Sequence, residues 1–532
     1  MKKNQQTKYV FVTGGVISGV GKGIMAASMG AVLKAKGFRV SVQKCDQYLN
    51  VDAGLLNPRE HGECFVTKDG AETDLDLGHY ERFLDEEMTG DSIWTSGKVY
   101  KKLLDTERAG GFGGGTVQLV PHVTDLVQQT FLDNAKRFNS DIHIIEIGGT
   151  VGDLEGAYYI EAIREFASRV GRQNCFYTHV VFVPYLSTSH EYKTKPAQNS
   201  IRDLRELGII PDMVAARVDK VNADAPVIAK KLAMFCGIAE DAVVVLPNAD
   251  SVYEVPLNLV KLGGLKPLDR YVDHGEPDMS AWQKLVCRIH AEPKKEVTVG
   301  LVAKYVDNTD TYISVTEALK AAAWAENVKL NIKWIDAEKQ VTRESLASVD
   351  GLLVPGGFGV RGLDGKIAAA SYALQDNKPY LGLCLGLQMA VIAAARLGGL
   401  KRANSEEIDA KAPENVIYIM DDQKGLESTG GTMRLGDYPA VLVKNSKVAK
   451  IYKTEYVIER HRHRYEVNQK FLPEIQMGGL VVAGTSPDGK LVEFIEAPKH
   501  KFFIATQAHP EFKSRPIHPH PLFVAFVKSL GR

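Results

Sequence analysis

The feature that most constrains the fold of this chain is an apolar stretch that runs into a glycine-rich loop near the N-terminus. Lys8 to Thr13 is predicted to be a strand, Gly14 to Gly23 (GGVISGVGKG) a loop, and Ile24 to Lys36 a helix. Gly37 then provides a helix end. Glycine amides and a helix N-terminus favour bound anions, and Lys22 can reach terminal phosphates. The sequence therefore predicts an α/β domain whose first loop holds phosphates.

This loop departs from the common pattern G-x-x-x-x-G-K-[ST]. Five residues separate Gly15 from Gly21, and Gly23 stands where a hydroxyl that binds Mg²⁺ is usual. A magnesium ligand must then come from elsewhere, because Mg²⁺ prefers hard oxygen ligands such as carboxylates. The candidates are Glu146, at the end of the strand predicted over 141–146, and Asp76, in an acidic run. A capped strand end and a solvated charged face are the respective alternatives.

A second strand-to-helix turn surrounds Cys384. The apolar run into Gly382 predicts a buried strand, and Leu385 to Leu397 predicts a helix. Glycines on both sides allow a sharp turn, and the helix N-terminus favours the thiolate form of the cysteine. Far downstream, His509 and Glu511 supply a base and a carboxylate to orient it. A buried core cysteine is the alternative, but the G-x-C-x-G spacing with a downstream His-x-Glu favours a nucleophile.

A further glycine-rich loop follows the apolar stretch 351–354. The loop, 355–359, reads P-G-G-F-G and can present a backbone amide to a developing oxyanion. The amide of Leu385, directly after the cysteine, is the second candidate donor. Taken alone, the same five residues are equally typical of a simple turn.

Longer motifs link the chain to known families. The Cys384, His509 and Glu511 pattern resembles the class I glutamine amidotransferases over about residues 297 to 532. Five motifs resemble the CTP synthase family over nearly the whole chain, from Tyr9 to about Leu530: 71–82 (AETDLDLGHYER), 146–153 (EIGGTVGD), 193–200 (KTKPAQNS), 430–436 (GGTMRLG) and 459–468 (ERHRHRYEVN).

This resemblance implies an architecture and a reaction. It implies two doubly wound α/β domains: a P-loop-like (dethiobiotin-synthetase-like) synthetase domain over 1–265, and a flavodoxin-like triad glutaminase domain over 297–532, with a linker over 266–296. ATP would phosphorylate the uracil 4-oxo group of UTP, and ammonia from glutamine would displace the phosphate to give CTP. The resemblance further implies Mg²⁺ with the ATP, GTP as an allosteric activator, and assembly into homotetramers or filaments.

The resemblance also assigns roles to individual residues. By it, Cys384 is the nucleophile, His509 the base and Glu511 the orienting carboxylate. Its remaining assignments are, for ATP, Gly19, Val20, Gly21, Lys22, Gly23, Ile24, Lys44, Asp76, Asn248 and Ala249; for UTP or CTP, Ser18, Asp153, Leu154, Glu155, Lys193, Thr194, Lys195, Pro196, Ala197, Gln198 and Lys231; for glutamine, Gly357, Leu385, Gly386, Leu387, Gln388, Glu407 and Arg464; and for magnesium, Asp76 and Glu146.

Besides Gly19 and Val20, which stand where the family often has serine and leucine, four positions depart from the family's usual residues. Gln47 and Ala53 stand where prolines are usual, so we expect a looser loop there. Gly113, in a glycine cluster, replaces a leucine in a region that the family associates with ammonia transfer and GTP activation, so we expect some ammonia to escape. Ala508 replaces an aromatic residue before the histidine.

Two other functions stay open. Enzymes that amidate carboxylates, of the cobyrinate diamide synthase type, would share this architecture, although the 71–82 and 193–200 motifs favour CTP synthase. A structural protein with an inactive site is the other, and the presence of all three triad residues argues against it.

Composition limits the partners. Lys plus Arg and Asp plus Glu both number 65, so no basic excess indicates nucleic acid or a membrane surface. The N-terminus is polar, and no apolar stretch approaches the ~20 residues that span a bilayer. Six cysteines lie scattered without CxxC pairs, which indicates a reducing cytoplasm and no zinc site.

Overall fold

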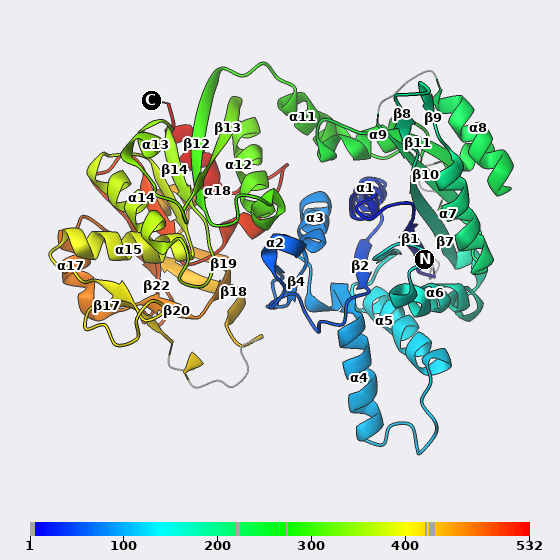
Figure 1. Ribbon diagram of the computed structural model, residues 1–532, viewed down its shortest axis with the longest axis horizontal. Coiled ribbons are helices and arrows are strands. Elements are labelled where there is room, and N and C mark those ends of the chain that lie inside the picture. The colour runs from blue at the N-terminus through cyan, green and yellow to red at the C-terminus, as the bar shows by residue number, and fades with distance from the viewer. Residues whose placement is uncertain are drawn as a thin grey trace, which may run out of the picture. The chain divides into compact units, whose positions relative to one another are not determined.

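The computed structural model describes residues 6–219, 224–264, 266–272, 275–420, 423–424 and 431–531. Gly430, the first residue of one motif, lies outside them. By their contacts, these residues divide into two compact units (Figure 1). Unit 1 consists of Met1–Asp52 and His79–Val286, and unit 2 of Ala53–Gly78 and Cys287–Arg532. The predicted domain and linker boundaries stay a prediction.

Unit 1 is built on a seven-stranded, wholly parallel sheet in the order β11-β10-β7-β1-β6-β2-β5. Its central strands are buried along nearly their whole length, which is typical of parallel sheets with helices on both faces. The strands are β1(Lys8–Gly14), β2(Val40–Asp46), β5(Ile93–Thr95), β6(Ile142–Ile147), β7(Cys175–Phe182), β10(Met213–Val218) and β11(Val243–Pro247), with a hairpin of β8(Tyr185–Leu186) and β9(Glu191–Tyr192). The helices are α1(Lys22–Ala35), α4(Ser96–Arg108), α5(Thr124–Arg137), α6(Ala157–Val170), α7(Lys195–Glu206), α8(Ala225–Cys236), α9(Val255–Lys261), α10(Lys266–Asp269) and α11(Ser280–Ile289), whose last three residues belong to unit 2.

The first loop of unit 1 connects β1 to α1 through backbone that favours glycine. Gly19 and Gly21 have φ values of 71° and 97°, in the left-handed region. Gly21 is the N-cap, so α1 begins at Lys22, two residues before the predicted start at Ile24. Val16 also has a positive φ, 79°, which is unfavourable for a β-branched residue.

Unit 2 is built on a nine-stranded sheet in the order β13-β12-β14-β15-β23-β22-β21-β18-β19. The first five strands are parallel and have the flavodoxin-like order 2-1-3-4-5, and the other four continue antiparallel. Both predicted doubly wound α/β folds are therefore confirmed. The strands are β12(Lys295–Ala303), β13(Val328–Asp336), β14(Gly351–Val354), β15(Tyr380–Leu383), β18(Arg434–Leu442), β19(Tyr456–His463), β21(Val481–Thr485), β22(Val492–Glu496) and β23(Phe503–Thr506); a small sheet holds β16(Asn404–Ser405), β17(Asn415–Ile419) and β20(Tyr465–Val467). The helices are α12(Ile313–Glu326), α13(Arg343–Ala347), α14(Leu363–Gln375), α15(Leu385–Leu397), α16(Lys447–Tyr452), α17(Leu472–Met477) and α18(Pro521–Ser529).

Unit 2 also contains an N-terminal segment, 53–78, that the sequence did not lead us to expect there. The segment holds α2(Pro58–His61), β3(Phe65–Val66), β4(Glu72–Thr73) and the start of α3(Leu75–Leu84). Arg460 Nη1 donates to Val66 O at 2.8 Å, and Arg462 Nε donates to Glu72 Oε1 at 2.8 Å. Glu63 Oε1 accepts from the Ser314 amide in the first turn of α12. These bonds to the buried Arg460, the half-buried Arg462 and a helix N-terminus hold the segment on unit 2.

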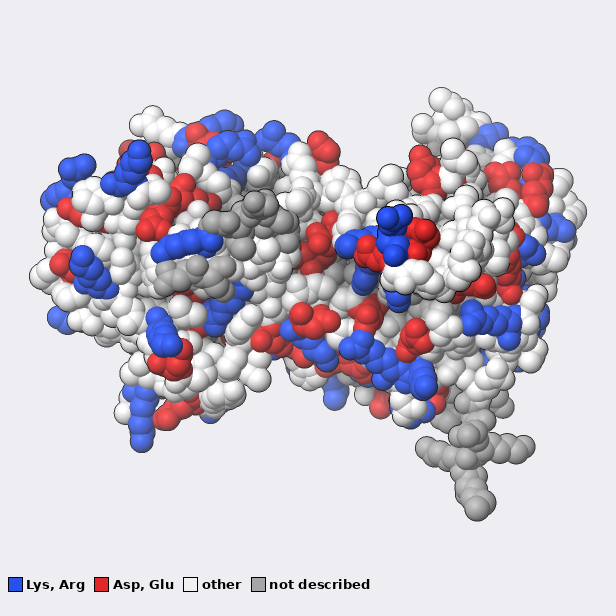
Figure 2. Space-filling model, turned by 90° about the horizontal axis from the view of Figure 1, so that it is seen from below, with Lys and Arg blue, Asp and Glu red and all other residues white. Residues whose placement is uncertain are grey.

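The face of the molecule shown in Figure 2 has no large patch of one charge. Positive and negative side chains are interspersed there (Figure 2). Among the described residues, no helix combines the length and the apolar character that a membrane crossing requires.

Candidate active sites

Cys384 lies at a sharp turn between β15 and α15. Its φ of 49° and ψ of −103° are unusual for a residue with a side chain, and the turn is held by a 2.8 Å bond from its amide to Thr506 O. A Cβ at position 386 would collide with Val354 O, and one at position 382 would lie 2.8 Å from the Gly386 carbonyl. The glycines are thus needed for close approach of backbone to backbone.

His509 is oriented by Glu511. Nδ1 donates to Glu511 Oε1 at 2.7 Å, and the ring stacks on Phe512 with centroids 5.1 Å apart. Burial lowers the pKa of His509, but the Glu511 carboxylate and the neighbouring Cys384 thiol outweigh it and raise the pKa to about 10. Nε2 is buried and makes no hydrogen bond with the described residues. At Gly356 a Cβ would lie 2.6 Å from the ring, so glycine makes room for the histidine.

The sulfur of Cys384 is surrounded by polar groups although the residue is only 2% exposed. Gln507 Nε2 lies 3.6 Å from Sγ, and the thiol lies 3.7 Å from Arg462 O. Gln388 Nε2 donates to Gln507 Oε1 at 3.4 Å, which orients the Gln507 amide with its nitrogen toward the sulfur. Residues 385–388, which were predicted to bind the substrate glutamine, form the buried first turn of α15.

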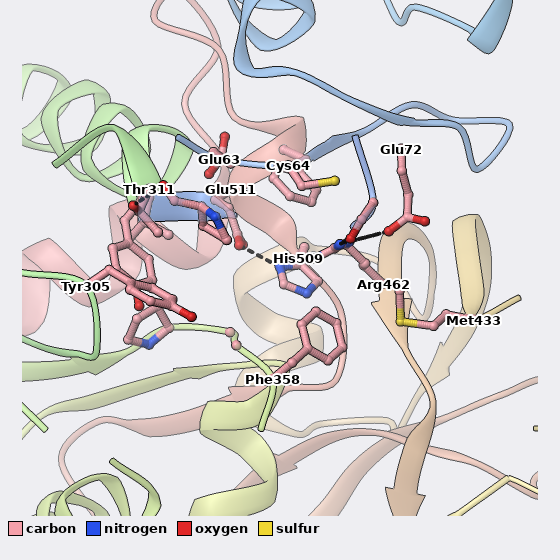
Figure 3. A pocket seen from close by; sticks show the side chains of 18 of the residues that line it. Glu63, Cys64, Glu72, Tyr305, Thr311, Phe358, Met433, Arg462, His509 and Glu511 are labelled. Atoms are coloured by element: carbon pink, nitrogen blue, oxygen red, sulfur yellow. Dashed lines mark hydrogen bonds and ion pairs between the residues drawn. The ribbon is translucent and has the colours of Figure 1, made fainter. Parts of the chain in front are cut away.

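A cavity of about 510 Å³ in unit 2 opens beside the histidine (Figure 3). This volume is in the range of small-molecule sites, roughly 300–1,000 Å³. The cavity brings together five predicted residues and several that the sequence analysis missed. The predicted ones are Gly357, Glu407, Arg464, His509 and Glu511; the others include Glu63, Cys64 and Glu72 of the N-terminal segment, with Tyr305, Phe358, Met433 and Arg462.

Charged groups hold the wall of this cavity. Arg462 lies over the Phe358 ring, 4.8 Å from its centroid, and also bonds Glu72. The Gly359 amide donates to Glu407 Oε1 at 2.7 Å. Burial raises the pKa of Glu407, while that bond and Lys304 act in the opposite direction. Contacts among the lining residues therefore hold the side chains of Arg462 and Glu407 in place.

In unit 1, a cavity of about 340 Å³ brings predicted ATP residues together. Val20, Gly21 and Ile24 line it, with Asn248 and Ala249. Arg217, at the end of β10, was not predicted. Its Nη1 lies 3.3 Å from both Gly19 O and Val20 O, and its Nε donates to Asn248 Oδ1 at 2.7 Å. Arg217 thus ties the phosphate loop to the segment after β11.

Of three further predicted residues, Lys22 begins α1, while Lys44 and Glu146 lie near the carboxyl ends of the neighbouring strands β2 and β6. Lys22 Nζ donates to Gly149 O at 2.7 Å, and Glu146, 2% exposed, accepts from the Tyr80 hydroxyl. Lys44 pairs with Glu146 across β2 and β6 and lies 3.5 Å from Asp46. The buried Glu146 carboxylate is the kind of hard oxygen donor that Mg²⁺ prefers. Asp76 belongs to unit 2 by its contacts, so its pairing with Glu146 stays a prediction.

The predicted UTP and CTP residues form separate groups. Residues 153–155 follow β6, where Asp153 Oδ2 accepts from the Thr150 amide at 2.7 Å. Residues 193–198 follow the β8–β9 hairpin, where the Lys193 amide donates to Pro184 O just after β7, and open α7; Lys231 lies in α8 and Ser18 in the first loop. Because β6 and β7 flank β1 in the sheet, these groups lie on opposite sides of the phosphate loop's strand.

The comparisons with known proteins agree over both units. Two family models match: CTP synthase N-terminus over residues 8–270 and glutamine amidotransferase class-I over residues 308–529. A CTP synthase of Carboxydothermus hydrogenoformans is 50% identical over 531 residues, which cover 98% of this chain and 98% of the relative. The chain belongs to the CTP synthase family.

Other relatives extend this match. The CTP synthase of Methanocaldococcus jannaschii is 48% identical, again with 98% of both chains covered. The solved glutaminase domain of Trypanosoma brucei CTPS with bound acivicin is 38% identical over 44% of this chain and 93% of that chain, with a TM-score of 0.41. As a CTP synthase family member, the chain is a glutamine-hydrolysing ligase whose reaction depends on ATP. The carboxylate-amidating alternative is not supported.

Gln47 and Ala53, which stand where the family usually has proline, each bond another segment of the chain. Gln47 Nε2 donates to Gly148 O at 2.9 Å, and a Cβ at Gly149 or Gly156 would collide with its amide. Ala53 is buried, and its amide donates to Glu72 O. Both residues thus contact neighbouring segments, and the looser loop stays a prediction.

The other two departures differ in exposure. Gly113 is exposed with a φ of 60°, so a leucine there would be strained in this conformation. Ala508 is 1% exposed, so the smaller residue is still closely packed. The predicted loss of ammonia stays a prediction.

Proposed function

We propose that the chain aminates UTP to CTP, with glutamine hydrolysed in unit 2 and ATP consumed in unit 1. The observation that carries this proposal is that one chain holds both chemistries. Unit 2 has Cys384 at a strained turn and His509, which Glu511 orients. Unit 1 has a glycine-rich loop whose Lys22 bonds Gly149 O, in the loop that follows β6 and its buried Glu146. Neither site alone would account for both halves of the chain.

The proposed glutaminase reaction starts at Cys384. Its sulfur attacks the amide carbon of glutamine, so that a C–S bond forms while the carbonyl π electrons move to oxygen. The thiol proton passes to Nε2 of His509, which then delivers it to the departing nitrogen, and ammonia leaves. Water then attacks the thioester carbon while His509 takes its proton, and the C–S bond breaks to give glutamate and the Cys384 sulfur, which receives that proton from His509. The bond from Nδ1 to Glu511 supports these roles because it directs Nε2 away from the carboxylate.

Glutamine would be oriented by the residues that line the cavity. The amide of Leu385 is one proposed oxyanion donor, because the first amides of a helix have no partner within the helix, and the amide of Gly357, in the loop of residues 355–359, is the other. Glu407 and Arg464 carry the opposite charges needed for the α-amino and α-carboxyl groups of glutamine. Residues 386–388 complete the proposed site.

In unit 1 the proposed chemistry is phosphoryl transfer to the uracil 4-oxo group. Bound Mg²⁺ would neutralise charge on the transferring phosphoryl group, with Glu146 and Asp76 as its proposed ligands. Lys22 and Lys44 supply positive charge, and residues 19–24 the backbone amides for the phosphates. Asn248 and Ala249 would line the adenine site. UTP would be bound by Ser18, 153–155, 193–198 and Lys231.

Regulation and assembly are also proposals. We infer GTP as an allosteric activator, a homotetramer or filament as the assembled state, and the cytoplasm as location. The position of residues 153–155 and 193–198 on opposite sides of β1 supports a UTP site completed by a second subunit.

The proposal is tested by following CTP formation with the purified chain. UTP, ATP and Mg²⁺ are supplied with either glutamine or an ammonium salt, and the absorbance difference between uracil and cytosine nucleotides is recorded alongside glutamate release. We expect CTP with both nitrogen sources, and none when UTP or ATP is omitted. The absence of CTP with both sources, in chain that still releases glutamate, would contradict the proposed substrate.

A further inference from the structure

A buried lysine that the proposed mechanism does not use lies against the loop of residues 355–359. Lys366, on α14, is 0% exposed. Its Nζ donates to Pro355 O at 3.0 Å and, more weakly, to Gly356 O at 3.5 Å. Burial and the nearby Lys304 lower its pKa to about 7, although Cys384 and Glu407 act in the opposite direction. A buried ammonium is costly, and an apolar side chain of similar size would often be more stable.

A second lysine holds the other half of the same loop. Lys304, directly after β12 and 2% exposed, donates to Phe358 O and lies 3.3 Å from Gly359 O. The carbonyls on either side of Gly357 are therefore turned toward two lysines. A Cβ at Gly357 would lie 3.6 Å from Lys366 Nζ and 3.6 Å from the Leu385 side chain. The loop thus passes between Lys366 and the start of α15.

The orientation of these carbonyls determines where the Gly357 amide points. In a trans peptide the C=O and N–H groups point in opposite directions. With Gly356 O turned toward Lys366, the N–H of Gly357 points away from that lysine. We propose that Lys366 is a positioning residue of the glutaminase reaction, which holds the Gly357 amide in the orientation of an oxyanion donor. This inference rests on the proposed function of Cys384.

The main test compares two lysine-to-methionine variants. In K366M the loop carbonyls lose their donor, so we expect kcat for glutamine hydrolysis to fall about 10- to 100-fold with a much smaller change in KM, because an oxyanion donor acts in the transition state. Ammonia-dependent CTP formation should stay at the wild-type rate. The matched control is K447M, because Lys447 on α16 also donates to two loop carbonyls of unit 2, Ala497 O and His500 O. We expect that control to keep full glutaminase activity.

Two probes of Cys384 separate positioning from loss of structure. Iodoacetamide alkylates a thiolate without forming an oxyanion, so the alkylation rate of Cys384, followed by mass spectrometry, should be equal in K366M and wild type. The γ-aldehyde analogue of glutamine adds the sulfur to its carbonyl carbon, and the oxygen so formed needs the same donors as the reaction. We expect K366M to bind this aldehyde about 10-fold or more weakly. K366Q, which retains an N–H donor, should lie between K366M and wild type.

Each outcome decides the proposal. Wild-type kcat and aldehyde affinity in K366M would overturn it. So would equal losses of aldehyde affinity, Cys384 alkylation and ammonia-dependent synthesis in both K366M and K366Q, which would show that Lys366 only maintains the fold. Failure of the underlying function is distinguishable, because glutamine hydrolysis would then survive in C384A.

Discussion

The two candidate sites differ in what their reactive groups touch. In unit 2, the predicted base contacts its orienting carboxylate and lies beside the predicted nucleophile. In unit 1, the predicted phosphate-binding lysine bonds a backbone carbonyl of the next loop, and the predicted metal ligand bonds a tyrosine. Amide hydrolysis needs a fixed nucleophile and base, whereas phosphoryl transfer depends on positioning charged substrates. The groups of the proposed glutaminase site therefore contact one another, whereas those of the proposed nucleotide site contact a backbone carbonyl and a tyrosine.

The strained backbone follows the same contrast. Cys384 has a positive φ at the point where chemistry is proposed, and glycines at 382 and 386 make that turn possible. Val16 has a positive φ in the phosphate loop, where the proposed role belongs to backbone amides. The strained backbone thus positions the Cys384 side chain in the proposed glutaminase site and backbone N–H groups of the first loop in the proposed nucleotide site.

The largest effect is expected from C384A. Removing the nucleophile should lower glutamine-dependent CTP formation by about 10³-fold or more and leave ammonia-dependent formation largely intact. Both rates are measured with the same absorbance assay. The control is C287A, because Cys287 is an exposed free cysteine of the same chain. Equal loss with both nitrogen sources would remove the separation of the two sites.

A smaller but broader effect is expected from K22A and E146A. Each removes a charged group from the proposed transfer site, so CTP formation should fall about 10²-fold with either nitrogen source. Basal glutamine hydrolysis should persist. K34A is the control, because Lys34 lies near the other end of α1. Unchanged ammonia-dependent turnover would exclude the substituted residue from the transfer site.

The pH dependence of protein stability tests whether the His509–Glu511 ion pair is already formed in the folded chain. The folded pKa of His509, about 10, exceeds the usual 6.5, so the pair stabilises the folded chain fully below pH 6.5 and loses this effect as the pH rises toward 10. We therefore expect E511Q to lower the melting temperature most at the acidic end of this range and least near pH 10. Its glutaminase kcat should fall roughly 10-fold or more. A destabilisation that is constant with pH would contradict the raised pKa.

The smallest effect is expected at Gln47. Its amide bonds Gly148 O, next to the carbonyl that Lys22 holds. Q47A should free this turn and lower ammonia-dependent kcat by about 2- to 5-fold, since one neutral hydrogen bond contributes roughly 1 kcal/mol. Glutaminase activity is the internal control. An unchanged kcat would show that Lys22 alone positions the turn.

Much of the fold was predictable because its signals are local. The helix over 385–397 begins and ends as predicted, and the strand, loop and helix at the N-terminus differ by only a residue or two. Apolar runs and glycine positions determine such elements through contacts close in sequence. The pairing of Cys384 with His509 was inferred from spacing and resemblance, and the structure brings these residues near one another.

Other parts of the sites depend on contacts that no local pattern announces. Arg217 reaches the phosphate loop from β10, and Lys366 and Lys304 turn the carbonyls of 355–359 from two separate elements. Lys366 stands among apolar residues of α14 in the sequence. The sequence alone did not show that this lysine lies on the buried face of the helix.

The sequence by itself determined the two α/β folds and the two glycine-rich turns, before α1 and at Cys384, because each depends on residue types within a short stretch. Only the tertiary structure decided that residues 53–78 pack in unit 2 and that two buried lysines hold the loop beside Cys384. Burial and hydrogen bonding between residues far apart in the chain settle such questions. Those contacts exist only after the chain has folded.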